Sequence, residues 1–300
     1  MENIGGQAVI EGVMMKSATG WTVAVRAPDG NIEIKKENTK AIPNFLKFPI
    51  IRGVVALFEA LKIGIKAIEF SGSVAFVEED KKGESPFAFA ISIAIAILLA
   101  IAIFKFLPLY LTTLTASIMP MINKNYLVFN LIDGLLRVSF FLLYIFAIGL
   151  WGEMKKIYQY HGAEHKAIFA YEAGEALTIE NARKYAPYHP RCGTSFLLIV
   201  MVISILIFFL IPQHWSFTEK LFSRLLLVPL IAGVSYEILK LSAKNKENPL
   251  VRFVVLPGLC LQRLTVREPN DSQIEVALKA LTEVIAMNKD DKEKTLNNVR

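Results

Sequence analysis

Long apolar blocks alternate with polar segments along this 300-residue chain, and the lengths of the blocks suit membrane-spanning helices. A helix needs about 20 mostly apolar residues to cross a bilayer. The candidates are residues 87–109, 126–151, 196–211 and 221–241. The third block is short but uncharged, and the fourth is the weakest because it contains Arg224, Pro229 and Glu237. The pattern predicts a polytopic α-helical membrane protein with about four transmembrane helices.

The number of lysine and arginine residues alternates between high and low in the successive segments that the apolar blocks separate. The segment before the first block carries 11, residues 111–125 carry one, 152–195 carry six, 212–220 carry one, and the tail after residue 241 carries ten. Cytoplasmic loops of membrane proteins are rich in Lys and Arg. The alternation therefore predicts a multi-pass protein of the cytoplasmic (inner) membrane, with both termini and the 152–195 loop in the cytoplasm. It also supports the fourth span.

The two ends of the chain show patterns typical of a small soluble unit. Residues 7–14, 21–26 and 32–36 are predicted strands, with a turn at 28–31. Near the other end, residues 260–267 are a predicted strand, and 272–287 have the apolar periodicity of a helix. We expect a small cytoplasmic α+β unit, formed by a β-rich N-terminal segment (1–42) and a C-terminal segment with a strand and a helix (242–300).

Segment 43–85 is expected to contain an amphipathic helix followed by a linker. Its charges fall on one narrow helical stripe: Arg52, Glu59, Lys62, Lys66 and Glu69. This pattern is typical of a helix that lies in the membrane interface, or of one packed against the spans with its stripe toward water. A helix of an ordinary soluble domain is the alternative. The remaining segments are the spans at 86–151, the His-rich loop at 152–195 and the spans at 196–241.

Composition agrees with a membrane protein and excludes several other classes. The chain is 54% hydrophobic and 20% charged, with mean hydropathy +0.44 and net charge +6. Lysine and arginine flank apolar blocks instead of covering one soluble face, so no nucleic-acid partner is expected. The partner that the pattern indicates is the lipid bilayer. The two cysteines, Cys192 and Cys260, follow no secretory signal peptide and are expected to be reduced thiols.

The candidate chemistry lies in the 152–195 loop, where His161, Glu164 and His165 form an H-x-x-E-H pattern. At about 100° per residue, a helix places these three side chains on one side within one turn. Two imidazoles can hold one divalent metal ion, and zinc is the ion we expect. The carboxylate can then act as general base on a bound water. The alternative is an interfacial helix whose histidines bond to water, lipid headgroups or backbone.

A catalytic zinc needs a third protein ligand, and His189 and Cys192 are the candidates. If both bind, the set of His161, His165, His189 and Cys192 is closed and structural. If only one binds, a position stays open for water, and Glu164 has a molecule to activate. Cys192 could instead be a nucleophile paired with a histidine, or an inert buried side chain.

Two further carboxylates are candidates for positions just outside the metal ligands. Glu11 stands in a glycine-bracketed apolar segment and either points into the site or is a carboxylate of a turn or an edge strand. Glu237, near the cytoplasmic end of the fourth block, is a ligand, a partner for a histidine or lysine, or a side chain that reaches the interface. Asp133 and Arg137, four residues apart in the second block, are expected to pair with each other.

Three blocks, residues 5–15, 160–166 and 189–195, resemble the YqhQ-like family of bacterial membrane proteins, in this order and combination. The resemblance runs from about Gly5 to Met287. It implies a bacterial inner-membrane protein bearing a domain of unknown function and described as a predicted metal-dependent enzyme. It implies no substrate or reaction, and it directs attention to the same His-rich loop.

The leading hypothesis is a metal-dependent hydrolase at the cytoplasmic face of the membrane, acting on a membrane peptide or a lipid. The second is a non-enzymatic scaffold or regulator, with a structural metal site or no metal. A transporter ranks third, because only the fourth block, with Pro229 and Gly233, has the broken character of a transport helix. The oligomeric state is left open by the sequence.

Overall fold

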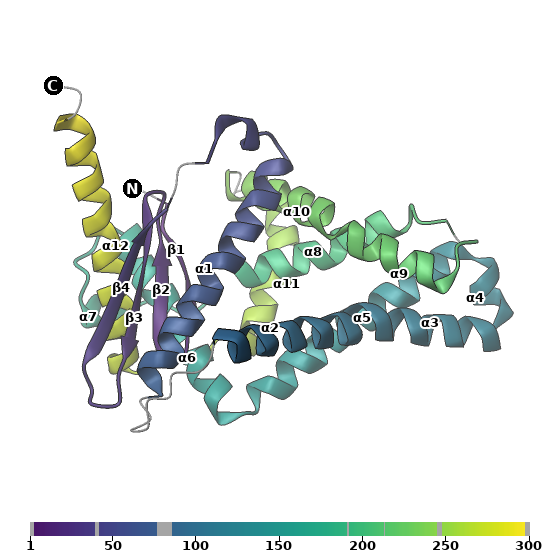
Figure 1. The fold of residues 1–300 in the computed structure, drawn as a ribbon, viewed down its shortest axis with the longest axis horizontal. Helices are drawn as coiled ribbons and strands as arrows, with labels where there is room; N and C mark the ends of the chain where they lie inside the picture. Colours follow the sequence, from purple (N-terminus) through teal and green to yellow (C-terminus); the bar gives the residue numbers. More distant parts are fainter. Residues whose placement is uncertain are drawn as a thin grey trace.

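The computed structural model describes residues 3–39, 42–76, 86–190, 192–212, 214–244 and 248–297. A small sheet and the helices packed on it lie at one end, and long apolar helices extend away from this unit (Figure 1). Most of the linker expected at the end of segment 43–85 lies outside the described residues. The described chain is mainly helical, with a small N-terminal antiparallel sheet.

The sheet contains four antiparallel strands in the order β1-β2-β3-β4. The strands are β1 (Gly5–Val9), β2 (Gly12–Lys16), β3 (Gly20–Arg26) and β4 (Ile32–Asn38). The prediction of one strand over 7–14 is wrong, because the chain turns between Val9 and Gly12. Glu11 occupies the left-handed region in this turn, with φ 47°. Both later strands form where the alternating pattern places them.

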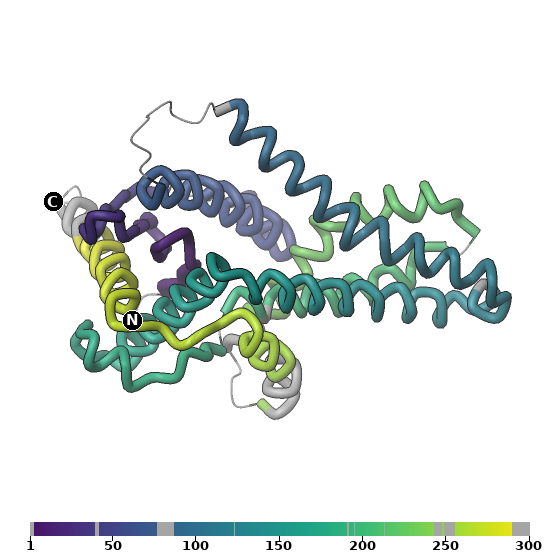
Figure 2. Tube along the Cα trace, turned by 90° about the horizontal axis from the view of Figure 1, so that it is seen from below, coloured from purple at the N-terminus to yellow at the C-terminus, as the bar shows by residue number. Residues whose placement is uncertain are grey.

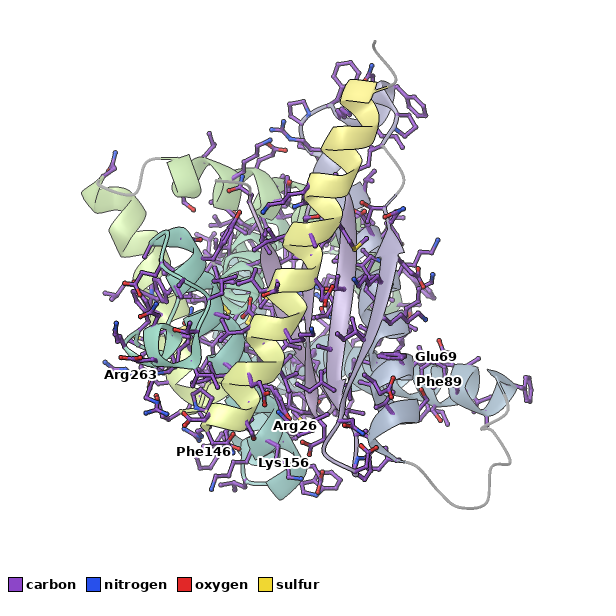
Figure 3. The ribbon with its side chains drawn as sticks, turned by 90° about the vertical axis from the view of Figure 1, so that its left-hand side faces the viewer. Arg26, Glu69, Phe89, Phe146, Lys156 and Arg263 are labelled. Carbon is purple, nitrogen blue, oxygen red and sulfur yellow. The ribbon has the colours of Figure 1, made fainter. Side chains whose placement is uncertain are left out.

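Alternate side chains of the sheet enter two separate cores. Met14, Val23 and Val25 pack against α1 (Ile51–Ala75). Val13 and Met15 pack on the other face, against α6 (Gly152–Glu172) and α12 (Asp271–Asn297). Figure 3 looks onto α12, which lies across the strands. The C-terminal segment therefore joins the N-terminal sheet through a helix.

The predicted strand at 260–267 is wrong, since these residues end helix α11 (Pro249–Thr265). Gly258, Leu261, Gln262 and Thr265 are buried, a spacing of three to four residues that suits a helix. The short alternating run at 260–267 has the pattern of a strand, but it continues a helix that begins at Pro249.

Two helices are long and apolar enough to cross a membrane. The first runs through α2 (Pro86–Ile101), a π-helical turn η2 (Ala102–Phe106) and α3 (Leu107–Ile118). It extends nine residues beyond the predicted 87–109 block, and α4 (Pro120–Lys124) follows it. Pro108 lacks an N–H to bond backward in the helix, which suits the irregular turn before it. The second is α5 (Tyr126–Gly149), which runs beside α3 and η2, while the start of α2 diverges from it (Figure 2).

The other predicted spans are shorter or bent. Helix α8 (Gly193–Phe208) has 16 residues, about 24 Å of helix. Helices α9 (Phe217–Leu226) and α10 (Val228–Lys244) are separated by one residue and meet at 45°. Pro229, in the first turn of α10, suits the start of a new helix. Counting this bent pair as one span gives a third candidate.

Helix α1 lies between the sheet and the apolar helices (Figure 1). Its predicted polar stripe is partly engaged in ion pairs, while Lys62 and Glu69 are exposed. The pairs are Lys16–Glu59 and Lys66–Glu37, both at 2.6 Å, and Arg52–Glu237. Its exposed side chains include an apolar group: Phe58, Leu61, Ile65 and Ile68. The short helices η1 (Asn44–Leu46) and α7 (Ile179–Arg183) complete the described elements.

Candidate metal centre

Helix α6 carries the H-x-x-E-H residues, and it packs between β1 and the end of α11. His161, Glu164 and His165 lie on one side of this helix, as the spacing predicts. The ring centroids of the two histidines are 4.5 Å apart. Gly162 makes this packing possible, because a Cβ at that position would lie 2.2 Å from the backbone oxygen of Arg267. A larger residue between the histidines would push α6 away from the segment that follows α11.

Three potential ligand atoms converge next to this helix. One nitrogen each from His161 and His165 and the sulfur of Cys192 all lie within 4.8 Å of one another. Nε2 of His161 is 3.1 Å from the sulfur. His165 is 2% exposed, and its Nε2 has no hydrogen-bond partner among the described residues. A buried polar atom in that position lacks the compensation that an ion or a water would give it.

Backbone carbonyls fix the tautomer of both rings. Nδ1 of His161 is 3.0 Å from the carbonyl oxygen of Thr265, and Nδ1 of His165 is 2.6 Å from that of Pro187. A carbonyl oxygen can only accept, so each Nδ1 carries the hydrogen of its bond, and in a neutral ring of this tautomer Nε2 has the free lone pair. This is the outer hydrogen bond that metal-binding histidines usually make. Both Nε2 atoms are therefore ready to bind a cation.

Cys192 reaches the cluster from the start of α8, where it is the N-cap residue. Its sulfur accepts hydrogen bonds from the backbone N–H and the hydroxyl of Thr194, at 3.4 and 3.3 Å. The side chain is buried, in contrast to exposed Cys260. These bonds hold the sulfur opposite the two histidines.

Glu164 lies beside the cluster and is 4% exposed. Its Oε2 is 3.5 Å from Nε2 of His165. Burial raises the pKa of Glu164 to about 7, although His161 and the backbone N–H of Gly6 favour the carboxylate. A Cβ on Gly6 would lie 2.8 Å from Cγ of Glu164. The close approach of β1 to this carboxylate thus requires a residue without a side chain.

The structure places His189 outside the group of three donors. Its backbone is fixed by Gln262 of α11, which accepts from its N–H at 2.9 Å and donates to its carbonyl at 2.8 Å. Nε2 of His189 lies 3.6 Å from Oε2 of Glu172. Its ring centroid is 5.7 Å from that of His165. Among the described residues, the converging donors are therefore His161, His165 and Cys192.

The two carboxylates considered as outer partners are bound elsewhere. Glu11 accepts from Lys156 at 2.8 Å and from the Tyr160 hydroxyl at 3.2 Å, so it ties the β1–β2 turn to α6. Glu237 accepts from Nε of Arg52 at 2.7 Å and joins α10 to α1. Neither is among the atoms that converge at the cluster.

Sequence reasoning missed the groups that orient the donors. Gly6 was visible only as part of a glycine pair, and Gln262 lies in the segment predicted as a strand. The carbonyls of Pro187 and Thr265 leave no signal in the sequence, because every residue has one. These contacts depend on how α6 packs against distant segments.

The donor set fits a divalent transition metal, and zinc in particular. Zinc binds histidine nitrogen and cysteine sulfur, and three protein ligands leave its fourth position open to water. A carboxylate next to such a position can take a proton from a water molecule. The arrangement can therefore support hydrolysis, and it can equally brace α6 against α8.

Comparison with known proteins gives a family without a described function. Residues 48–287 match the family described as "Protein of unknown function (DUF1385)". The chain is also similar to "Uncharacterized protein YqhQ" of Bacillus subtilis (strain 168), with 31% identity over 300 residues that cover 94% of this chain and 92% of that protein. No solved structure matches.

Proposed function

Because the chain belongs to the YqhQ-like family of proteins of unknown function (DUF1385), we propose its function from its own residues. We propose a metal-dependent hydrolase at the cytoplasmic face of the bacterial inner membrane. The observation that carries this proposal is the convergence of His161, His165 and Cys192 within 4.8 Å, with the Glu164 carboxylate beside them.

In this proposal His161 and His165 would hold a divalent ion through Nε2, and Cys192 would hold it through sulfur. The ion would supply Lewis acidity. Glu164 would take the proton from the attacking water and give it to the leaving group. Gly6 and the two backbone carbonyls keep these side chains in place before substrate arrives.

The membrane location is supported by the two or three apolar helices and by the alternation of Lys and Arg. The exposed apolar side chains of α1 add support, since they suit a helix that lies in the membrane interface. In this arrangement the cluster lies near the membrane surface, because α6 follows the end of α5 directly. The substrate class is a membrane peptide or a lipid.

A second candidate is a non-enzymatic scaffold or regulator that uses the same ion to brace its helices. The burial of the site favours it: His165 is 2%, Glu164 4% and Cys192 6% exposed. Structural zinc sites are closed in this way, whereas a hydrolase must admit a substrate. A variant that keeps the ion and removes the base distinguishes the hydrolase from the scaffold, because only the hydrolase then loses its function.

The first test is the metal content of detergent-purified protein, measured by plasma mass spectrometry. We expect about one ion per chain in the wild type and its loss in the His161→Ala/His165→Ala double variant. His214→Ala is the matched control, because His214 is an exposed histidine of the 212–216 connection. A wild type without metal after reconstitution with zinc, manganese and iron would overturn the proposed function.

The second test uses Glu164→Gln, which keeps the shape of the side chain and removes the base. A hydrolase keeps its ion and loses turnover by roughly 10²–10⁴-fold on quenched-fluorescent membrane peptides or phospholipid esters. Equal turnover in this variant and the wild type would exclude the proposed role of Glu164. A metal-loaded wild type that turns over neither substrate class would favour the scaffold.

A further inference from the structure

A second cluster of charges is formed by side chains of α5 and α9, two helices that extend away from the sheet (Figure 1). It consists of Asp133 and Arg137 on α5 and Arg224 on α9, and their exposures are 1%, 4% and 1%. Asp133 accepts from Arg224 at 2.7 Å through one oxygen and from Arg137 through the other. Arg137 also donates to the Ser204 hydroxyl at 2.9 Å. The predicted pair of Asp133 and Arg137 is thus part of a larger group.

The charges of this group do not balance. Two guanidinium groups, which stay protonated in proteins, share one carboxylate. Both lie over the ring of Phe208, at 4.7 and 5.0 Å from its centroid. The Nζ of Lys105 lies 5.4 Å from the centre of the same ring. Asp133 is the one carboxylate that pairs with either arginine in the described part of the chain.

Donor groups are also left over in this cluster. Nε of Arg137 and Nε of Arg224 are both buried and have no hydrogen-bond partner within the described ranges. A buried cation without a counter-charge costs much more than a neutral polar group, unless an anion comes to it. The excess of positive charge and of N–H donors therefore suits an anionic ligand.

The structure offers a place for that anion next to Arg224. A cavity of about 10 Å³ is lined by Tyr126, Phe129, Asn130, Ile211, Lys220 and Arg224. Three of these residues belong to the first turns of α5, whose N-terminal end carries the positive part of the helix dipole, while the Asn125 side chain accepts from the N–H groups of Leu127 and Val128. Lys220 adds a second cation, with its Nζ 4.9 Å from the centroid of Phe129.

We propose that this cavity binds a small monovalent anion of the size of chloride. A cavity volume of about 10 Å³ is room for about one small group, which favours a halide over a phosphate or a lipid headgroup. Binding would bring the missing negative charge to Arg224 and Lys220. The site is separate from the metal centre and does not depend on its function.

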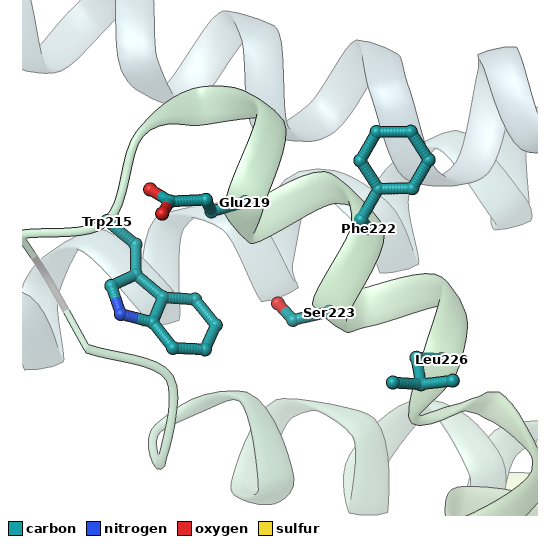
Figure 4. Close-up of a pocket in the computed structure, with 5 residues that line it drawn as sticks. All are labelled: Trp215, Glu219, Phe222, Ser223 and Leu226. Atoms are coloured by element: carbon teal, nitrogen blue, oxygen red, sulfur yellow. The ribbon is translucent and has the colours of Figure 1, made fainter.

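A larger pocket beside α9 lacks the positive charge that an anion site needs. It measures about 410 Å³ and is lined by Trp215, Glu219, Phe222, Ser223 and Leu226 (Figure 4). None of these five is a cation, and Glu219 would repel an anion. The proposal therefore concerns the small cavity beside Arg224 alone.

The test is thermal unfolding of the detergent-purified protein at constant ionic strength, with gluconate replaced stepwise by chloride or bromide. Above the dissociation constant, we expect the transition temperature to rise by roughly 2–5 °C for each tenfold increase in halide. Lys220→Gln should lose most of this rise. Lys124→Gln is the matched control, because Lys124 is exposed on α4 and does not line the cavity.

Broadening of the ³⁵Cl resonance by the protein gives a readout that does not depend on stability. We expect broadening with wild type and Lys124→Gln, and much less with Lys220→Gln. A transition temperature that ignores halide, or that responds equally in both variants, would overturn the proposal. So would a response to phosphatidylglycerol vesicles and to no halide, since that would mean a larger ligand.

Discussion

Replacing Gly6 by alanine tests how closely β1 approaches the candidate base. The new Cβ would lie 2.6 Å from the carbonyl oxygen of Met14, 2.8 Å from Cγ of Glu164 and 2.9 Å from the sulfur of Met15. The Met14 oxygen belongs to the β1–β2 ladder and cannot move alone. Gly5 is the matched control, because no atom lies within 4 Å of the corresponding Cβ position.

The size of the effect follows from these distances. Overpacking of this kind costs about 1–3 kcal/mol, since backbone and side chains must move apart. Alanine recovers about 0.5–1 kcal/mol relative to glycine, because the unfolded chain loses less freedom on folding. Gly6→Ala should therefore destabilise the protein by about 1–2 kcal/mol, whereas Gly5→Ala should stabilise it slightly.

Thermal unfolding of both variants in one detergent measures the difference. For domains of 150–250 residues, 1 kcal/mol corresponds to roughly 2–4 °C, so Gly6→Ala should melt several degrees below Gly5→Ala. Both variants should keep the ion that we propose, because neither new methyl group contacts a donor atom. Equal transition temperatures would refute the close contact between β1 and α6.

Three further substitutions test other contacts. Gly162→Ala should destabilise by about 3 kcal/mol or more, because its Cβ would lie 2.2 Å from a backbone oxygen; Gly152→Ala, with open space around it, is the control in chemical unfolding. Asp133→Asn should cost about 3–5 kcal/mol by the same assay, because it leaves two buried guanidinium groups without their carboxylate. Lys66 holds the pKa of Glu37 below its usual range. This pairing stabilises the fold above the usual carboxyl pKa and is lost as pH falls through the lowered one, so wild type and Lys66→Gln should differ in transition temperature at pH 7 and converge in acid.

The parts of the site that the sequence predicts are those within one helical turn. His161, Glu164 and His165 share a side of α6 because the helix repeat puts them there, whatever surrounds the helix. The choice between His189 and Cys192 could not be predicted in the same way. They stand only three residues apart in the sequence. The backbone of His189 is bound by Gln262 of α11, a contact that Cys192 does not share. A contact across 73 residues has no local pattern.

The same limit explains the errors in the fold. The turn at Glu11 was missed because residues 7–14 form one apolar run that contains a single glycine, Gly12. A lone glycine inside a strand pattern does not show whether the chain continues, bulges or turns there. Residues 260–267 alternate well enough for a strand, and only their continuity with the preceding helix decides otherwise. Asp133 and Arg137 are neighbours on one helix and were paired correctly, whereas Arg224 reaches Asp133 from α9, 91 positions away.

The orientation of the donors rests mainly on backbone, and this has a consequence for how the site tolerates change. The carbonyls of Pro187 and Thr265 set the tautomers of His165 and His161, and no substitution removes a carbonyl. A side-chain change at either position can act only by moving the chain. The site should therefore be more sensitive to Gly162, which allows α6 to approach the segment that follows α11, than to the side chain of Thr265. Thr265→Val should keep about one ion per chain, and Gly162→Ala should lose part of it, when metal content is measured under the same conditions. Full loss in Thr265→Val would show that the hydroxyl, and not the carbonyl, orients His161.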